Sequence, residues 1–157
     1  MDSELKRAHP GHEASVLTRL VNLIEGDAGD LTKSWLAQVR HDASLPNYQR
    51  LDNSELYNRA YRVYSHLGKW ISRETTKEEI ARDYIALGAQ RRKEGFALSE
   101  VIQALFLIRR TLWRKIMDEG LLDTTYDLYQ AIELNDRVTL FFDRAVFFTA
   151  VGYERGA

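Results

Sequence analysis

The residues with the greatest potential for chemistry in this sequence are its four histidines, because the chain has no cysteine. His9 and His12 lie three residues apart beside Glu13, and this spacing could hold a metal ion, although the Pro-Gly pair between them indicates an irregular segment. His66 lies alone in a predicted helix, where it could ligate haem in a globin-like fold, but a structural histidine is the simpler interpretation. We therefore expect neither a metal ion nor a cofactor.

No catalytic constellation can be assembled from the other side chains. The serines lie outside any nucleophile-elbow context, and no glutamate is followed by a histidine at the Glu-x-x-His spacing of di-iron bundles. Glycine-rich phosphate loops of the dinucleotide or Walker type are also absent from the sequence. We therefore expect a protein that is not an enzyme and has no catalytic residues.

The composition narrows the class of protein further. Twenty-two basic against 23 acidic residues give a net charge near −1, which provides no electrostatic basis for nucleic-acid or membrane-surface binding. The absence of cysteine suits a reducing compartment, and the polar residues among the first thirty interrupt any signal or membrane-spanning run, so we expect a cytoplasmic protein. A length of 157 residues suits one domain, preceded by a flexible arm over residues 1–12.

The elements that must position any site are helices, because apolar residues recur at three- and four-residue spacing and only two prolines interrupt the chain. The periodicity predicts about six helices: one that carries residues 16–24 and ends at Gly26, one capped by Asp30, one from Asp52 through Ile71, one from Thr76 to Gly95, one that ends at Gly120, and one from Asp123 or Thr124 to Gly152. We expect an all-α domain, either a helical bundle or a haem-less globin-like fold, with the third, fifth and last helices at its centre.

The last predicted helix is apolar on nearly every side over Leu140–Val151, which one small domain can rarely bury alone. One stripe carries Phe141, Ala145 and Phe148, and a second carries Phe142, Val146 and Thr149. We expect one stripe to face the protomer core and the other a second copy of the chain. The candidate interface of a homodimer is therefore Phe141, Phe142, Ala145, Val146, Phe148 and Thr149.

A Gly-Phe-x-Leu-x-Glu turn joins two predicted helices, and the second of these carries Arg-Arg-x-Leu-Trp. The residues of this pattern are Arg91, Gly95, Phe96, Leu98, Glu100, Arg109, Arg110, Leu112 and Trp113. The pattern resembles the N-terminal helical (RsbRD-type) domain of RsbR-like stress regulators, which also precedes bacterial sensor histidine kinases. The similarity extends loosely over residues 14–153.

The resemblance implies a non-catalytic signal-input and dimerisation module of a bacterial regulatory or two-component protein. It also implies a downstream signalling domain or protein of the STAS or kinase type, to which the last helix passes a conformational change. A small-molecule or haem-binding globin-like sensor is the alternative.

The pattern residues have structural roles on physical grounds. Gly95 suits a left-handed helix end, beyond which Phe96 or Leu98 can supply the apolar contact of the cap. Arg109 and Arg110 lie about 100° apart on a helix, so at most one faces the core. A buried arginine would need a carboxylate such as Glu100 or an acid of the last helix.

Overall fold

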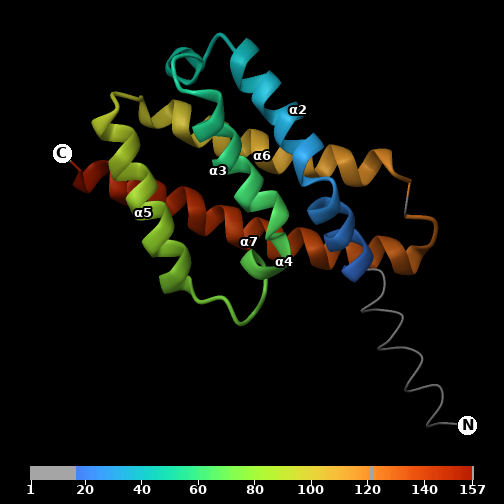
Figure 1. The fold of residues 1–157 in the computed structure, drawn as a ribbon. Coiled ribbons are helices and arrows are strands. Elements are labelled where there is room, and N and C mark those ends of the chain that lie inside the picture. Colours follow the sequence, from blue (N-terminus) through green and yellow to red (C-terminus); the bar gives the residue numbers. More distant parts are fainter. Residues whose placement is uncertain (1–16, 121, 157) are drawn as a thin grey trace, which may run out of the picture.

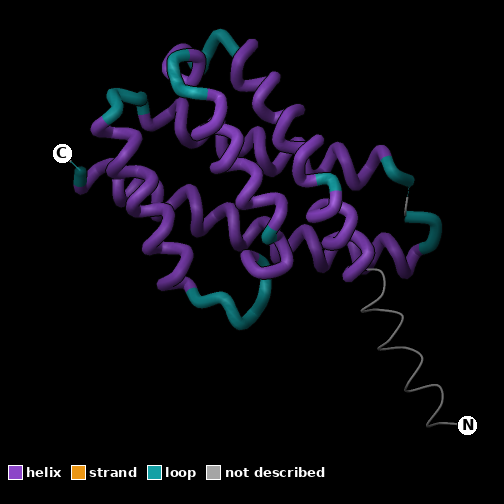
Figure 2. Tube along the Cα trace, in the orientation of Figure 1, coloured by secondary structure: helices purple, strands orange, loops and turns teal. Residues whose placement is uncertain are grey.

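The computed structural model describes residues 17–120 and 122–156, and all regular structure in these ranges is helical (Figure 2). Residues 17–26 are helical and are followed by α2 (Ala28–His41), the 3-10 helix η1 (Pro46–Gln49), α3 (Asn53–Ser65), α4 (Leu67–Trp70), α5 (Lys77–Lys93), α6 (Leu98–Asp118) and α7 (Thr125–Arg155). The predicted all-α fold with a long C-terminal helix is confirmed. The expected arm over residues 1–12, with His9 and His12, lies outside the described residues.

The two longest helices, α6 and α7, run antiparallel, and α2, α3 and α5 lie across them (Figure 1). Both long helices bury side chains along most of their length, from Glu100 to Ile116 in α6 and from Asp127 to Gly152 in α7. The sequence prediction placed α3 with them at the centre, but the most extensive contact between two helices joins α5 to α7. None of the helices in the described ranges combines the length and apolar character needed to cross a lipid bilayer.

Several predicted helix ends are confirmed by their hydrogen bonds and backbone angles. The Thr76 hydroxyl accepts a hydrogen bond from the Glu79 amide at 3.2 Å, and the Thr124 hydroxyl accepts one from the Asp127 amide at 3.0 Å. These contacts satisfy amide groups that the first turn of a helix leaves unpaired. Gly95 and Gly120 adopt φ values of +84° and +64°, the left-handed conformation that glycine adopts at low cost after a helix.

Two predicted boundaries are wrong. Asp30 does not cap the second helix, because α2 already begins at Ala28 and the Asp27 carbonyl accepts from the Leu31 amide, whereas Gly26 is the last residue of the first helix, as predicted. The helix predicted over residues 52–71 is broken at His66, where φ is −120° and ψ is 28°.

His66 is exposed and lies beside the Ser65 hydroxyl, so it does not face the core as a haem ligand would. The described ranges hold no group of three or more histidine, aspartate or glutamate side chains placed to bind a metal ion.

Helices α5 and α7 touch backbone to backbone at two glycines. A Cβ atom on Gly88 would lie 2.0 Å from the Thr149 carbonyl oxygen, and one on Gly152 would lie 2.0 Å from the Ile85 carbonyl oxygen. Helix axes that carry ordinary side chains at their contact are separated by about 8–10 Å. The crossing therefore depends on the absence of a side chain at both positions.

We predict that Gly88→Ala lowers the free energy of unfolding by about 3 kcal/mol, because the added methyl group forces α5 and α7 apart. Urea unfolding followed by circular dichroism measures this change. Gly26→Ala is the matched control, since a Cβ there meets nothing within 4 Å and alanine favours the helix by up to about 1 kcal/mol. Equal midpoints for Gly88→Ala and the wild type would contradict the close crossing.

Candidate functional site

A row of exposed apolar side chains runs along the outer side of α7. Tyr129, Ile132, Leu140 and Phe147 are 68%, 58%, 49% and 60% exposed. At 3.6 residues per turn they lie within an arc of about 80° and span about 27 Å of helix. We call these four residues the outer stripe. Asp136 and Asp143 are exposed within the same arc. Large apolar side chains that gather on one exposed face are typical of an interaction surface.

Four of the six residues expected at a dimer interface are instead inside the protomer. Phe141, Phe142, Ala145 and Thr149 are all buried within the single chain. The Phe141 ring lies 5.5 Å from that of Trp70 and 5.8 Å from that of Tyr84. The expectation that one of the two stripes stays exposed is therefore wrong for these residues, because α5 covers α7 closely at the glycine crossing and α6 packs on it as well.

The other two predicted interface residues, Val146 and Phe148, are half-buried against the core. Phe148 also lies beneath the ammonium group of Lys77, 5.9 Å from its ring centre. The outer stripe was not predicted from the sequence because α7 is apolar on several sides. The spacing of Leu140 and Phe147, seven residues apart, is the signal that could have identified it.

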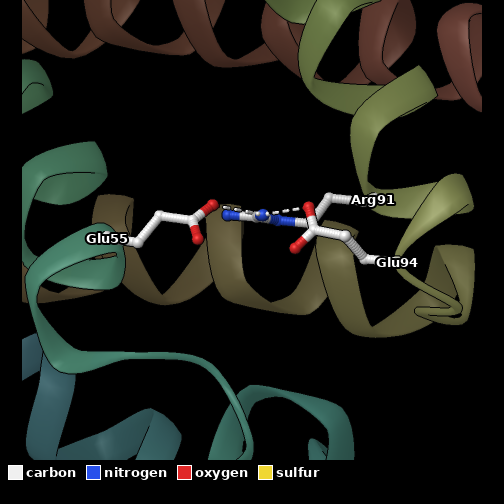
Figure 3. A network of polar contacts seen from close by, with 3 residues as sticks. All are labelled: Glu55, Arg91 and Glu94. Atoms are coloured by element: carbon white, nitrogen blue, oxygen red, sulfur yellow. Dashed lines mark hydrogen bonds and ion pairs between the residues drawn. The ribbon is translucent and has the colours of Figure 1, made fainter.

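The guanidinium group of the pattern residue Arg91 is buried near the α5–α6 turn, between the carboxylates of Glu55 and Glu94 (Figure 3). Arg91 is 2% exposed, and its Nη1 atom donates to Glu55 at 3.1 Å and to Glu94 at 2.8 Å. Its guanidinium carbon lies 5.2 Å from the centre of the Phe96 ring and 6.0 Å from that of the Tyr48 ring. Two carboxylates and two aromatic faces thus compensate the desolvation of one cation.

The electrostatics of this cluster keep its groups in one protonation state near neutral pH. Burial acts to lower the pKa of Arg91, but the Tyr48 hydroxyl and the Glu55 and Glu94 carboxylates outweigh it and raise the pKa above its usual value. Burial raises the pKa of Tyr48 to about 12. Burial, together with the nearby charge of Arg91, lowers the pKa of Arg59. Arg91 thus stays charged and Tyr48 stays neutral. Groups with a fixed protonation state can join helices but are unsuited to transferring protons.

Glu100 is buried and ties η1 to the start of α6. Its carboxylate accepts hydrogen bonds from the Ala97 amide at 3.1 Å and from the Asn47 amide at 2.9 Å. The idea that Glu100 pairs with a buried arginine of α6 is wrong, because backbone amides already occupy its oxygens. Arg109 lies over the Phe106 ring at 5.1 Å, and Arg110 is exposed.

The structure therefore divides the sequence pattern into two groups. Arg91, Phe96 and Glu100 meet around η1 at the α5–α6 turn, whereas Arg109, Arg110 and Trp113 lie farther along α6. Leu98 and Trp113 are half-buried. Sequence reasoning missed the contributions of Tyr48, Asn47 and Glu55. Asp52 and Glu55 have the spacing of a capping box, but the Asp52 side chain accepts a hydrogen bond from the Ser54 amide instead.

Comparison with known protein families identifies a matching family. The sequence model of the family described as "RsbT co-antagonist protein rsbRD N-terminal domain" matches residues 29–157. This range contains the whole pattern, η1 and helices α3 to α7. No curated protein and no solved structure matches the chain.

We predict that Arg91→Met lowers the free energy of unfolding by about 3 kcal/mol, because Glu55 and Glu94 lose the cation that compensates them. Chemical denaturation measures the loss. The control is Arg110→Met, which removes an exposed guanidinium and should change stability by less than about 0.5 kcal/mol. A loss no larger than that of the control would show that the cluster contributes little.

We predict that Tyr48→Phe weakens the dependence of stability on alkaline pH. In the unfolded chain Tyr48 ionises near pH 10, whereas in the folded protein its pKa is about 12. The contribution of Tyr48 to the free energy of unfolding is therefore complete below pH 10. It is lost between pH 10 and pH 12, at about 1.4 kcal/mol per pH unit. Urea unfolding between pH 8 and about pH 11 should therefore show a steeper decline for the wild type than for Tyr48→Phe. Tyr61→Phe, a change at a tyrosine that is 40% exposed on α3, should decline as the wild type does.

Proposed function

The chain belongs to the family of RsbT co-antagonist protein rsbRD N-terminal domains, and from this membership we propose that it is a non-catalytic input module that acts as a homodimer. The family itself indicates a signalling input domain of a stress regulator. The finer proposal is that two copies pair through the outer stripe of α7. A downstream partner of the STAS or kinase type would then receive the signal, and the cytoplasm is the proposed location.

The outer stripe is the observation that carries this proposal. Fully burying a side chain such as Phe147 or Leu140 contributes about 1.5–3 kcal/mol relative to leaving it in water. In a two-fold symmetric pair each copy offers the same face, so one stripe supplies both sides of the contact. The outer stripe is about 27 Å long, so the same stripe of a second copy can cover it along its whole length. It lies on α7, the helix that packs most extensively within its own chain.

The chemistry of the buried arginine cluster supports a role without catalysis. One oxygen of Glu55 and one of Glu94 accept hydrogen bonds from Arg91, and Glu100 accepts from backbone amides. These polar groups hold α3, η1, α5 and α6 together. The exposed position of His66 does not support a haem-binding sensor.

We predict that Phe147→Glu converts a dimer of twice 18.2 kDa to a monomer. A carboxylate in a desolvated contact should weaken dimerisation about 100-fold, whereas the fold tolerates it because Phe147 is 60% exposed in the protomer. Sedimentation equilibrium at micromolar concentration gives the mass, and circular dichroism verifies the fold.

Met117→Glu is the matched control, because Met117 is 66% exposed on α6 rather than on α7. This variant should remain dimeric. A monomeric wild type would contradict dimerisation, and a dimeric Phe147→Glu would show that the outer stripe is not the interface.

A further inference from the structure

A cavity of about 330 Å³ lies between α7 and the segment that leads from α4 into α5. Trp70, Ile80 and Phe141 form its apolar walls. Arg73, Arg137 and Arg144 also line it, as do the acidic side chains of Glu133 and Asp136. Sites for small organic ligands commonly have about this volume, and this cavity combines apolar walls with several charged groups.

The charges in this cavity are unequally matched. Arg137 donates to Glu133 at 2.9 Å, so these two side chains compensate each other. The side chains of Arg73, which is exposed, and of Arg144, which is half-buried, form no hydrogen bond or ion pair with any residue in the described ranges. Three guanidinium groups against two carboxylates leave a net charge of +1. A concave surface with unpaired guanidinium groups attracts an anion and can bind it through charge-assisted hydrogen bonds.

We propose that this cavity binds a small organic acid with one carboxylate group and an apolar body. The carboxylate pairs with Arg73 and Arg144, and the body packs on Trp70, Ile80 and Phe141. A single negative charge matches the net charge of the lining, whereas the carboxylate of Asp136 disfavours a doubly charged phosphate monoester. A neutral ligand of the same shape would form no charge-assisted hydrogen bond with either guanidinium group.

The cavity also has a place in the proposed signalling role. Leu140 lines the cavity and belongs to the outer stripe, so a bound acid lies at the edge of the proposed dimer contact. This consequence rests on the proposed function, but binding itself does not. The two can therefore be tested separately.

The test is a titration of isotope-labelled protein with octanoate, followed by nuclear magnetic resonance. The indole N–H signal of Trp70, identified by its loss in Trp70→Phe, reports on the cavity. We expect this signal to shift saturably, while those of Trp35 and Trp113, which lie outside the cavity lining, stay in place. Repeating the titration with Phe147→Glu separates binding from dimerisation, because a shift in a monomeric protein needs no second copy.

Substitutions and alternative probes distinguish the recognition of the carboxylate from general apolar binding. Arg73→Gln and Arg144→Gln should each weaken octanoate binding about 10-fold, since each removes a hydrogen bond to a charged group. Arg155→Gln is the control, because Arg155 is exposed on the same helix outside the cavity and should leave the affinity unchanged. Octanol should not bind, and octyl phosphate should bind more weakly than octanoate.

Three results would overturn the proposal. The first is the absence of a saturable shift up to about 10 mM octanoate. The second is equal binding of octanol, or an affinity for octanoate that neither arginine substitution changes, because the guanidinium groups would then have no role. The third is tighter binding of octyl phosphate, which would assign the cavity to phosphate monoesters.

Discussion

The contact between the backbones of α5 and α7 decides which side of the long helix faces the core. With no side chain at Gly88 or Gly152, the two helices approach until carbonyl oxygens occupy the space of a Cβ atom. The C-terminal part of α7 is then held by two hydrogen bonds, from Arg92 to the Tyr153 carbonyl at 2.8 Å and from the Tyr153 hydroxyl to the Phe96 carbonyl at 2.7 Å. The outer stripe and the cavity beside it exist because this contact fixes the rotation of α7.

The buried arginine cluster connects the α5–α7 contact to the helices that pack around it. Arg91 follows Gly88 by one helical turn, so the helix that crosses α7 also carries the guanidinium that reaches Glu55 on α3. Phe96 packs on Tyr48 at 4.9 Å and accepts the hydrogen bond from Tyr153. A short stretch of sequence around the α5–α6 turn therefore joins α3, η1 and α7.

Local features were predictable from the sequence, and long-range partners were not. Helix ends at Thr76, Gly95 and Thr124 follow from side chains and glycines within four residues, so reading the sequence was enough. The pairing of Arg91 with Glu55 joins residues 36 positions apart, and no local spacing indicates it. The rotation of α7 was also beyond sequence reasoning, because apolar residues occupy several of its sides and two isolated glycines decide which side is covered. The cavity depends on that rotation and on the break at His66, so it could not be predicted either.

The unequal anchoring of α7 has a consequence for motion within the domain. Its last two turns hold the glycine crossing and both Tyr153 hydrogen bonds, whereas its first turns expose Leu128, Tyr129 and Ile132 to solvent. Local opening of a helix costs least where few apolar contacts cover it. Fluctuations of α7 should therefore grow with distance from Gly152, and backbone amides near Thr125 should exchange their hydrogens sooner than those near Thr149. The C-terminal end of α7 is thus held firmly and its N-terminal end loosely. Small rearrangements around the first turns of α7 can therefore occur without disturbing the α5–α7 contact.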